Sequence, residues 1–229
     1  MQINAISDFI MSLTLVATPM GNIEDISLRA KKTLESCEVL ILEEFREGSS
    51  LIKALGIERK DMHQLNEHSK DDDIKDLFAL CKTKECALIS DCGTPNFCDP
   101  GAALVKMCRK NGVPVDSVPG PSSLMHILSL SSERLNEFYF RGFLPAKSDA
   151  RSKAIDELKT DKRPMIIMDT PYRLKKTISE LAEAMPKRKA LLGINLTQED
   201  QMVLENQLGV LATEVGQIKA EFMLLIYQA

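Results

Sequence analysis

Short apolar runs alternate along the chain with segments whose apolar residues recur every three or four positions. Residues 13–17 form an apolar, β-prone run that stops at the turn cluster 18–22. A segment of helical period follows, and residues 39–42 are apolar again. The alternation continues to a last predicted strand at 221–227. Strands that alternate with helices predict an α/β fold with mixed, largely parallel sheets.

Capping and turn residues bound many of the other predicted elements. Three acids at 71–73 predict the first turn of a helix, and Asp99-Pro100 predicts the N-terminus of another helix, which Gly112 ends. Further strands are predicted near 86–89, 114–118, 138–143, 164–168 and 190–194, and further helices up to residue 130, over 148–159, from 170 to about 185, and over 207–215.

The rigid sequence Pro119-Gly120-Pro121 divides the chain into two halves of the same α/β character. We therefore predict an N-terminal domain at 11–119 and a C-terminal domain at 120–229. Residues 1–10 are interpreted as an extension, and either Met1 or Met11 fits as the start of the protein.

The charge balance argues against a protein that is coated by nucleic acid, because the net charge is −4. Between Arg141 and Lys176, however, ten Lys or Arg accompany five Asp or Glu. This basic segment is either a phosphate-binding surface or a solvated helix face.

The six cysteines include no CxxC pair, and only three histidines are present, so no metal site is predicted. We interpret the thiols as buried or incidental groups in a reducing cytosol, with disulfides as the alternative. No apolar run approaches the roughly 20 residues that a membrane-spanning helix needs, so no membrane association is expected.

Two glycine-containing loops follow predicted strands and are candidates for ligand binding. Residues 90–101 contain Gly93, where the backbone can approach a flat ligand, but neither GxGxxG nor GxxxxGK[ST] occurs. Residues 119–123 form the second loop. The alternatives are a turn-rich connection for the first loop and a simple helix cap at Ser122 for the second.

Acidic residues also follow two of the predicted strands. Asp25 comes after the turn cluster, and Glu43 and Glu44 come directly after the strand at 39–42, with Arg46 close by. At the carboxyl ends of parallel strands such residues can face a common crevice. They are either helix-end charges or catalytic carboxylates.

Several of these motifs together resemble one known family, the ribosomal RNA small subunit (cytidine-2′-O)-methyltransferases of the tetrapyrrole methylase superfamily. The similar motifs, in the family's order, are VATPMGNIEDISLRA, LNEHSK, ISDCGTPNFCDPG, VPGPSSL, FRGFLPAKSDAR and TPYRL.

The resemblance implies two α/β domains, with S-adenosylmethionine in the cleft between them, and a homodimer. It implies a methyltransferase that acts on ribosomal RNA or on the small ribosomal subunit. The cofactor-binding residues that it implies are Pro19, Cys92, Gly93, Thr94, Pro95, Phe97, Ser122, Ser123, Asp169 and Leu196.

For catalysis, a ribose hydroxyl needs a base, and the candidates are Glu44, Asp25 and Asp99. The candidate substrate contacts are Arg46, Lys147, Arg151 and Lys153. The chain departs from the family at Phe45, at the acidic run 198–201 and in lacking the extra C-terminal domain. These departures leave two alternatives, a methyltransferase for a porphyrinoid or other small molecule and a cofactor-binding protein without catalysis.

Overall fold

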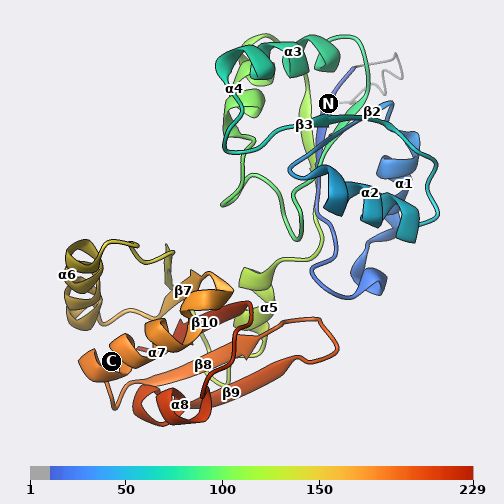
Figure 1. The fold of residues 1–229 in the computed structure, drawn as a ribbon. Coiled ribbons are helices and arrows are strands. Elements are labelled where there is room, and N and C mark those ends of the chain that lie inside the picture. Colours follow the sequence, from blue (N-terminus) through green and yellow to red (C-terminus); the bar gives the residue numbers. More distant parts are fainter. Residues whose placement is uncertain (1–10, 229) are drawn as a thin grey trace, which may run out of the picture. The chain divides into compact units, whose positions relative to one another are not determined.

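The computed structural model describes residues 11–228, which form two compact units, one ending at Ser122 and the other beginning at Ser123 (Figure 1). We call them the N-terminal unit and the C-terminal unit. The extension predicted for residues 1–10 lies outside the described residues. Within the described residues, no helix is both long enough and apolar enough to span a membrane.

In the N-terminal unit, helices and strands alternate as predicted. The elements are β1 (Leu13–Val16), the 3-10 helix η1 (Ile23–Asp25), α1 (Leu28–Ser36), β2 (Val39–Leu42), α2 (Phe45–Ala54), β3 (Asp61–Gln64), α3 (Asp71–Cys81), β4 (Cys86–Leu88), α4 (Ala102–Lys110) and β5 (Val115–Val118). The strands form one sheet in the order β3-β2-β4-β1-β5, in which every pairing is parallel. All five strands therefore end at the same edge, which we call the carboxyl edge.

Helices cover both faces of this sheet, because successive side chains of a strand point to opposite sides. Val39 and Ile41 pack with α3 and α4, whereas Leu40 and Leu42 pack with α1 and α2. Figure 1 shows the two helix pairs on opposite sides of the strands. Gly48 lets α2 lie close to β2, since a Cβ there would be 2.6 Å from Cδ2 of Leu42.

The C-terminal unit contains a second five-stranded sheet, in the order β6-β7-β10-β8-β9. Its elements are α5 (Ser123–Ser129), β6 (Tyr139–Gly142), α6 (Ser148–Thr160), β7 (Met165–Asp169), the 3-10 helix η2 (Pro171–Arg173), α7 (Leu174–Ala184), β8 (Lys189–Ile194), β9 (Met202–Gln207), α8 (Leu208–Glu214) and β10 (Phe222–Ile226). Helices α6, α7 and α8 pack on one face of the sheet, and α5 packs on the other.

Five of the eight described strand pairings are parallel, which confirms the predicted mixed, largely parallel α/β fold. The three antiparallel pairings all lie in the C-terminal unit.

Two details of the prediction are wrong. Helix α4 begins at Ala102 with Gly101 as its N-cap, so Asp99 and Pro100 belong to the preceding loop and do not cap the helix. Elements α2, β3 and β9 have no counterpart in the sequence prediction.

Candidate active site

Main-chain hydrogen bonds join the loops that follow β1, β4 and β5. The amide of Thr18 donates to the carbonyl of Gly93 over 2.8 Å, and the amide of Gly93 donates to the carbonyl of Thr18 over 3.0 Å. The amide of Ala17 donates to the carbonyl of Val118 over 3.1 Å. The bond from Ala17 to Val118 continues the parallel pairing of β1 with β5, whereas Thr18 and Gly93 form an isolated antiparallel bridge beyond the ends of β1 and β4. Because β1 lies between β4 and β5, these bonds hold all three loops at the carboxyl edge.

Glycines allow the three loops to approach one another closely. Gly93 has a φ of 75°, a conformation that residues with a side chain seldom adopt. A Cβ on Gly120 would lie 3.1 Å from the Cβ of Ala17. The hydroxyl of Thr94 donates to the carbonyl of Pro121 over 2.9 Å, which links the loops after β4 and β5 directly. We call residues 17–20, 92–95 and 119–122 the loop junction.

The loop junction suits a small polar ligand that is held by main-chain groups and small side chains. Thr18 is fully buried, and its hydroxyl has no hydrogen-bond partner among the described residues. Such orphaned hydroxyls are uncommon in native proteins, because burying one without a partner costs free energy. The expected cofactor residues Pro19, Cys92, Gly93, Thr94, Pro95 and Ser122 all belong to the junction, and Phe97 follows in the same loop. Close backbone approach, small side chains and the unpartnered Thr18 hydroxyl together fit a site for a sulfonium nucleoside.

Four carboxylates lie next to the loop junction, at the ends of the neighbouring strands β2 and β4. We call Glu43, Glu44, Asp91 and Asp99 the acidic cluster. Oδ1 of Asp91 accepts a hydrogen bond from the amide of Glu44 over 3.1 Å, and Oε2 of Glu43 accepts one from the amide of Asp91 over 3.5 Å. The two loops are therefore tied together through their acidic side chains.

Partial burial is the main cause that raises the pKa of Glu43, Asp91 and Asp99 above their ordinary values. Neighbouring carboxylates raise the pKa of Glu43 and Asp91 further, because like charges disfavour ionisation. A hydrogen bond with Ser90 partly offsets the effect of burial on the pKa of Asp99. An acidic cluster of this kind binds a proton more readily than isolated carboxylates do.

A buried ionic network occupies the end of β7 in the C-terminal unit. The guanidinium of Arg151, 2% exposed, donates to Oδ2 of Asp169 over 3.1 Å, to Glu180 over 2.5 Å and to the hydroxyl of Thr177 over 2.6 Å. Asp169 also accepts hydrogen bonds from the hydroxyl of Thr177, the amide of Thr170 and the guanidinium of Arg173. All strong hydrogen-bonding directions of the Asp169 carboxylate are thus used within the protein.

This network corrects one expectation. Arg151 is predicted from sequence to contact the substrate, but its guanidinium is buried and compensates the charge of Asp169. The cofactor contact expected of Asp169 stays a prediction, and its carboxylate is fully buried and engaged within the C-terminal unit. Both side chains stabilise the C-terminal unit.

The remaining predicted residues of the C-terminal unit have simple positions. Leu196 is 7% exposed and packs in the core with Ile127, and the cofactor contact expected of it stays a prediction. Ser123 is the first residue of α5. Lys147 precedes α6 as its N-cap, and Lys153 is exposed on the same helix.

In the N-terminal unit, Asp25 and Arg46 stand apart from the contacts of the acidic cluster. Asp25 is exposed at the end of η1, and no contact with the cluster is found for it among the described residues. The side chain of Arg46 is 92% exposed in the first turn of α2 and lies 3.9 Å from Glu47. Of the three predicted bases, Glu44 and Asp99 belong to the acidic cluster, whereas Asp25 does not.

The family model of tetrapyrrole (corrin/porphyrin) methylases matches residues 12–212. The chain belongs to this family. A ribosomal RNA small subunit methyltransferase I from Neisseria meningitidis is 34% identical over 224 residues, which are 95% of this chain and 76% of the relative. A protein of the same name from Thermotoga maritima is 34% identical over 190 residues, which are 82% of this chain and 85% of the relative.

Solved structures of tetrapyrrole methylase fold are similar over nearly the whole chain. Uroporphyrin-III C-methyl transferase from Thermus thermophilus, in complex with S-adenyl homocysteine, has a TM-score of 0.66 at 16% identity and covers 94% of this chain and 97% of its own. Diphthine synthase has a TM-score of 0.69 at 14% identity and covers 94% of this chain and 89% of its own. Together with the family match, they confirm the expected class of enzyme, an S-adenosylmethionine-dependent methyltransferase.

Sequence reasoning did not single out two members of the acidic cluster of this tetrapyrrole methylase. Glu43 was considered only together with Glu44, and Asp91 was not considered as a catalytic carboxylate. The available signal was that acids follow both β2 and β4, which are adjacent in the sheet. Chain order hides this adjacency, because α2, β3 and α3 come between the two strands.

The raised pKa of Glu43 predicts a pH-dependent gain in stability for Glu43→Gln. In the folded protein, ionisation of Glu43 opposes folding, so stability is lost as the pH rises through its raised pKa. Glutamine cannot ionise, so the variant is expected to melt at a higher temperature than the wild type at pH 7. The difference should vanish below the ordinary pKa of 4.5.

Thermal melts followed by circular dichroism over a pH series measure this effect. The control is Glu58→Gln, which changes a carboxylate ahead of β3, outside the acidic cluster. This variant should have the melting temperature of the wild type at every pH. A gain of Glu43→Gln that is equal at all pH values would contradict the electrostatic explanation.

Proposed function

We propose that this tetrapyrrole methylase transfers a methyl group from S-adenosylmethionine to a ribose 2′-hydroxyl of small-subunit ribosomal RNA. The observation that carries the proposal is the similarity to proteins named ribosomal RNA small subunit methyltransferase I, at 34% identity over 95% of the chain. The loop junction and the acidic cluster at one sheet edge support it, because the reaction needs a nucleoside site next to a base.

The loop junction is proposed to bind the cofactor through Pro19, Cys92, Gly93, Thr94, Pro95 and Ser122, together with the neighbouring Phe97 and Ser123. When bound, S-adenosylmethionine supplies an electrophilic methyl group on a sulfonium. The protein's tasks are to align the acceptor hydroxyl with that methyl group and to exclude water. Gly93 and Gly120 keep the backbone close enough for main-chain contacts with the nucleoside.

Glu44 is proposed to accept the proton of the acceptor hydroxyl. It lies directly before α2, is exposed, and makes no capping hydrogen bond with its side chain, so a substrate can reach its carboxylate. Its main-chain amide donates to Asp91, which holds Glu44 beside the acidic cluster. Asp99 is the second candidate, because burial raises its pKa toward the range of a general base.

Arg46, Lys147 and Lys153 remain proposed contacts to RNA phosphates, since all three are exposed. We also propose a homodimer that works in the cytoplasm. Light scattering on the purified protein tests the dimer, and a monomer mass would reject it.

The decisive experiment is incubation with methyl-labelled S-adenosylmethionine and either purified small ribosomal subunits or a panel of porphyrinoids. The expected result is label in a ribose of the RNA, at a linkage that then resists alkaline cleavage. Label in a porphyrinoid alone would reject the RNA substrate. Cofactor binding without transfer to either acceptor would reject the catalytic role.

A further inference from the structure

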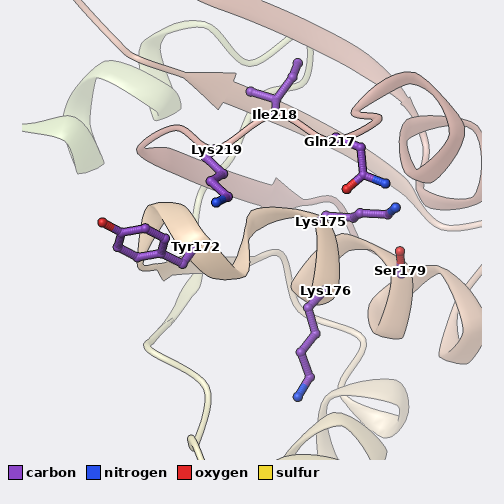
Figure 2. Close-up of a pocket in the computed structure, with 7 residues that line it drawn as sticks. All are labelled: Tyr172, Lys175, Lys176, Ser179, Gln217, Ile218 and Lys219. Atoms are coloured by element: carbon purple, nitrogen blue, oxygen red, sulfur yellow. The ribbon is translucent and has the colours of Figure 1, made fainter.

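A hollow of about 300 Å³ lies on the C-terminal unit beside the start of α7 (Figure 2). Tyr172 lines it from η2, Lys175, Lys176 and Ser179 line it from α7, and Gln217, Ile218 and Lys219 line it from the loop before β10. Gly216, with a φ of 57°, ends the turn after α8 from which this loop continues. The lining combines positive charge, hydrogen-bonding groups and an aromatic ring.

The positive charge of the hollow that no carboxylate among the described residues offsets comes from Lys175 and Lys219. Within the described part of the chain, neither ammonium forms an ion pair. Figure 2 shows Lys176 directed away from both, and its ammonium lies 3.8 Å from a carboxylate oxygen of Glu180. Lys175 stands in the first turn of α7, where the helix dipole disfavours a cation. Helix stability therefore does not explain why a lysine occupies this position.

Tyr172 presents its ring to solvent with 81% of the residue exposed. The Lys219 ammonium lies 5.8 Å from the ring centroid. The turn that carries Tyr172 is fixed, because Asp169 accepts hydrogen bonds from the amide of Thr170 over 2.9 Å and from Arg173 over 3.3 Å. An exposed aromatic ring on a turn held by hydrogen bonds, beside lysines that form no ion pair among the described residues, is an arrangement with which proteins stack nucleobases and hold phosphates.

We propose that this hollow binds a single-stranded segment of the RNA substrate, with one base stacked on Tyr172 and a neighbouring phosphate held by Lys175 and Lys219. The inference rests on the proposed function and adds a binding site for the same substrate. Ser179 and Gln217 offer hydrogen bonds to the sugar or the base edge. The chain as a whole carries a net charge of −4, so attraction of RNA depends on such local basic sites.

Binding of a fluorescent single-stranded RNA oligonucleotide, measured by anisotropy over a range of salt concentrations, tests the hollow. Lys175→Ala with Lys219→Ala is expected to weaken binding and to flatten the salt dependence by about 0.7 in log–log slope for each phosphate that is no longer bound. Tyr172→Ala is expected to weaken binding about tenfold or more, whereas Tyr172→Phe keeps the stacking surface and most of the affinity.

The matched control is Lys187→Ala, which removes an exposed lysine beyond the other end of α7 and should leave binding unchanged. If the lysine pair or Tyr172→Ala binds RNA as the control does, the inference is overturned. Equal losses in Tyr172→Ala and Tyr172→Phe would reject stacking. A melting temperature close to that of the wild type shows that each variant is folded.

Methyl transfer separates this inference from the proposed function. If the wild type methylates small ribosomal subunits and the variants raise the KM for subunits but not for the cofactor, the result supports both the proposed function and the RNA site in the hollow. Transfer with an unaltered KM for subunits rejects the hollow alone. A wild type that methylates no RNA but loses oligonucleotide binding in the variants rejects the proposed function and keeps the hollow as an RNA site.

Discussion

Glu44→Gln is expected to lower the kcat of methyl transfer by about 10²–10⁴-fold, the range for loss of a general base. The amide keeps the size of the side chain but cannot take the proton from a ribose hydroxyl. The Glu44 main chain still donates to Asp91, so the loops after β2 and β4 should stay joined. Cofactor affinity, measured by calorimetry, should therefore be close to that of the wild type.

The control for this prediction is Glu58→Gln, an equal chemical change ahead of β3, at the opposite edge of the sheet. Asp99→Asn, measured in parallel, separates the two candidate bases. Unchanged turnover in Glu44→Gln would remove Glu44 from the mechanism, and a large loss in Asp99→Asn alone would transfer the role to Asp99.

Arg151→Ala is expected to destabilise the protein by about 3–5 kcal/mol, as is usual when one partner of a buried ion pair is removed. The loss arises because Asp169, whose side chain is fully buried, would keep its charge without its main partner. For a chain of this size, about 2–4 °C per kcal/mol gives a decrease of roughly 10 °C in Tm. Differential scanning calorimetry measures it.

Lys153→Ala provides the matched control, since Lys153 lies on the same helix α6 but is exposed. Its effect on stability should stay within about 0.5 kcal/mol, the usual range for surface substitutions. A melting temperature that is equally insensitive to both substitutions would contradict the structural role of Arg151.

The sequence predicted the central strands of each sheet and the edge strands β5 and β6, but it missed the edge strands β3 and β9. β2, β4, β7 and β10 lie inside their sheets and are largely buried, so each appears as a continuous apolar run. β3 and β9 are the last strands of their sheets, and their largely polar side chains are mostly exposed or half-buried. Main-chain pairing with a neighbour determines such strands, and no hydrophobic pattern reports it.

Helix α2 was missed for a related reason. Its sequence contains a glycine and two serines, which lower helix propensity. The helix is stabilised by packing of Ile52 in the core and by the close approach of Gly48 to Leu42. Both interactions exist only once the helix lies against the sheet, so local propensity does not report them.

The loops of the candidate site could be predicted, whereas the partners of individual charges could not. Glycine and proline mark the turns at Gly93 and Pro119–Pro121 from local sequence alone. Arg151 and Asp169 each seemed suited to an external ligand, but they bind one another across 18 positions. Which charges pair depends on how α6 packs against β7, and a linear motif contains no information on that packing.

The reciprocal hydrogen bonds between Thr18 and Gly93 couple two motifs that are far apart in the sequence, so that they move together. A displacement of either segment has to break both bonds or carry the other segment along. When the segment DCGTP is transplanted into another member of the family, the segment TPMGN should therefore be transplanted together with it.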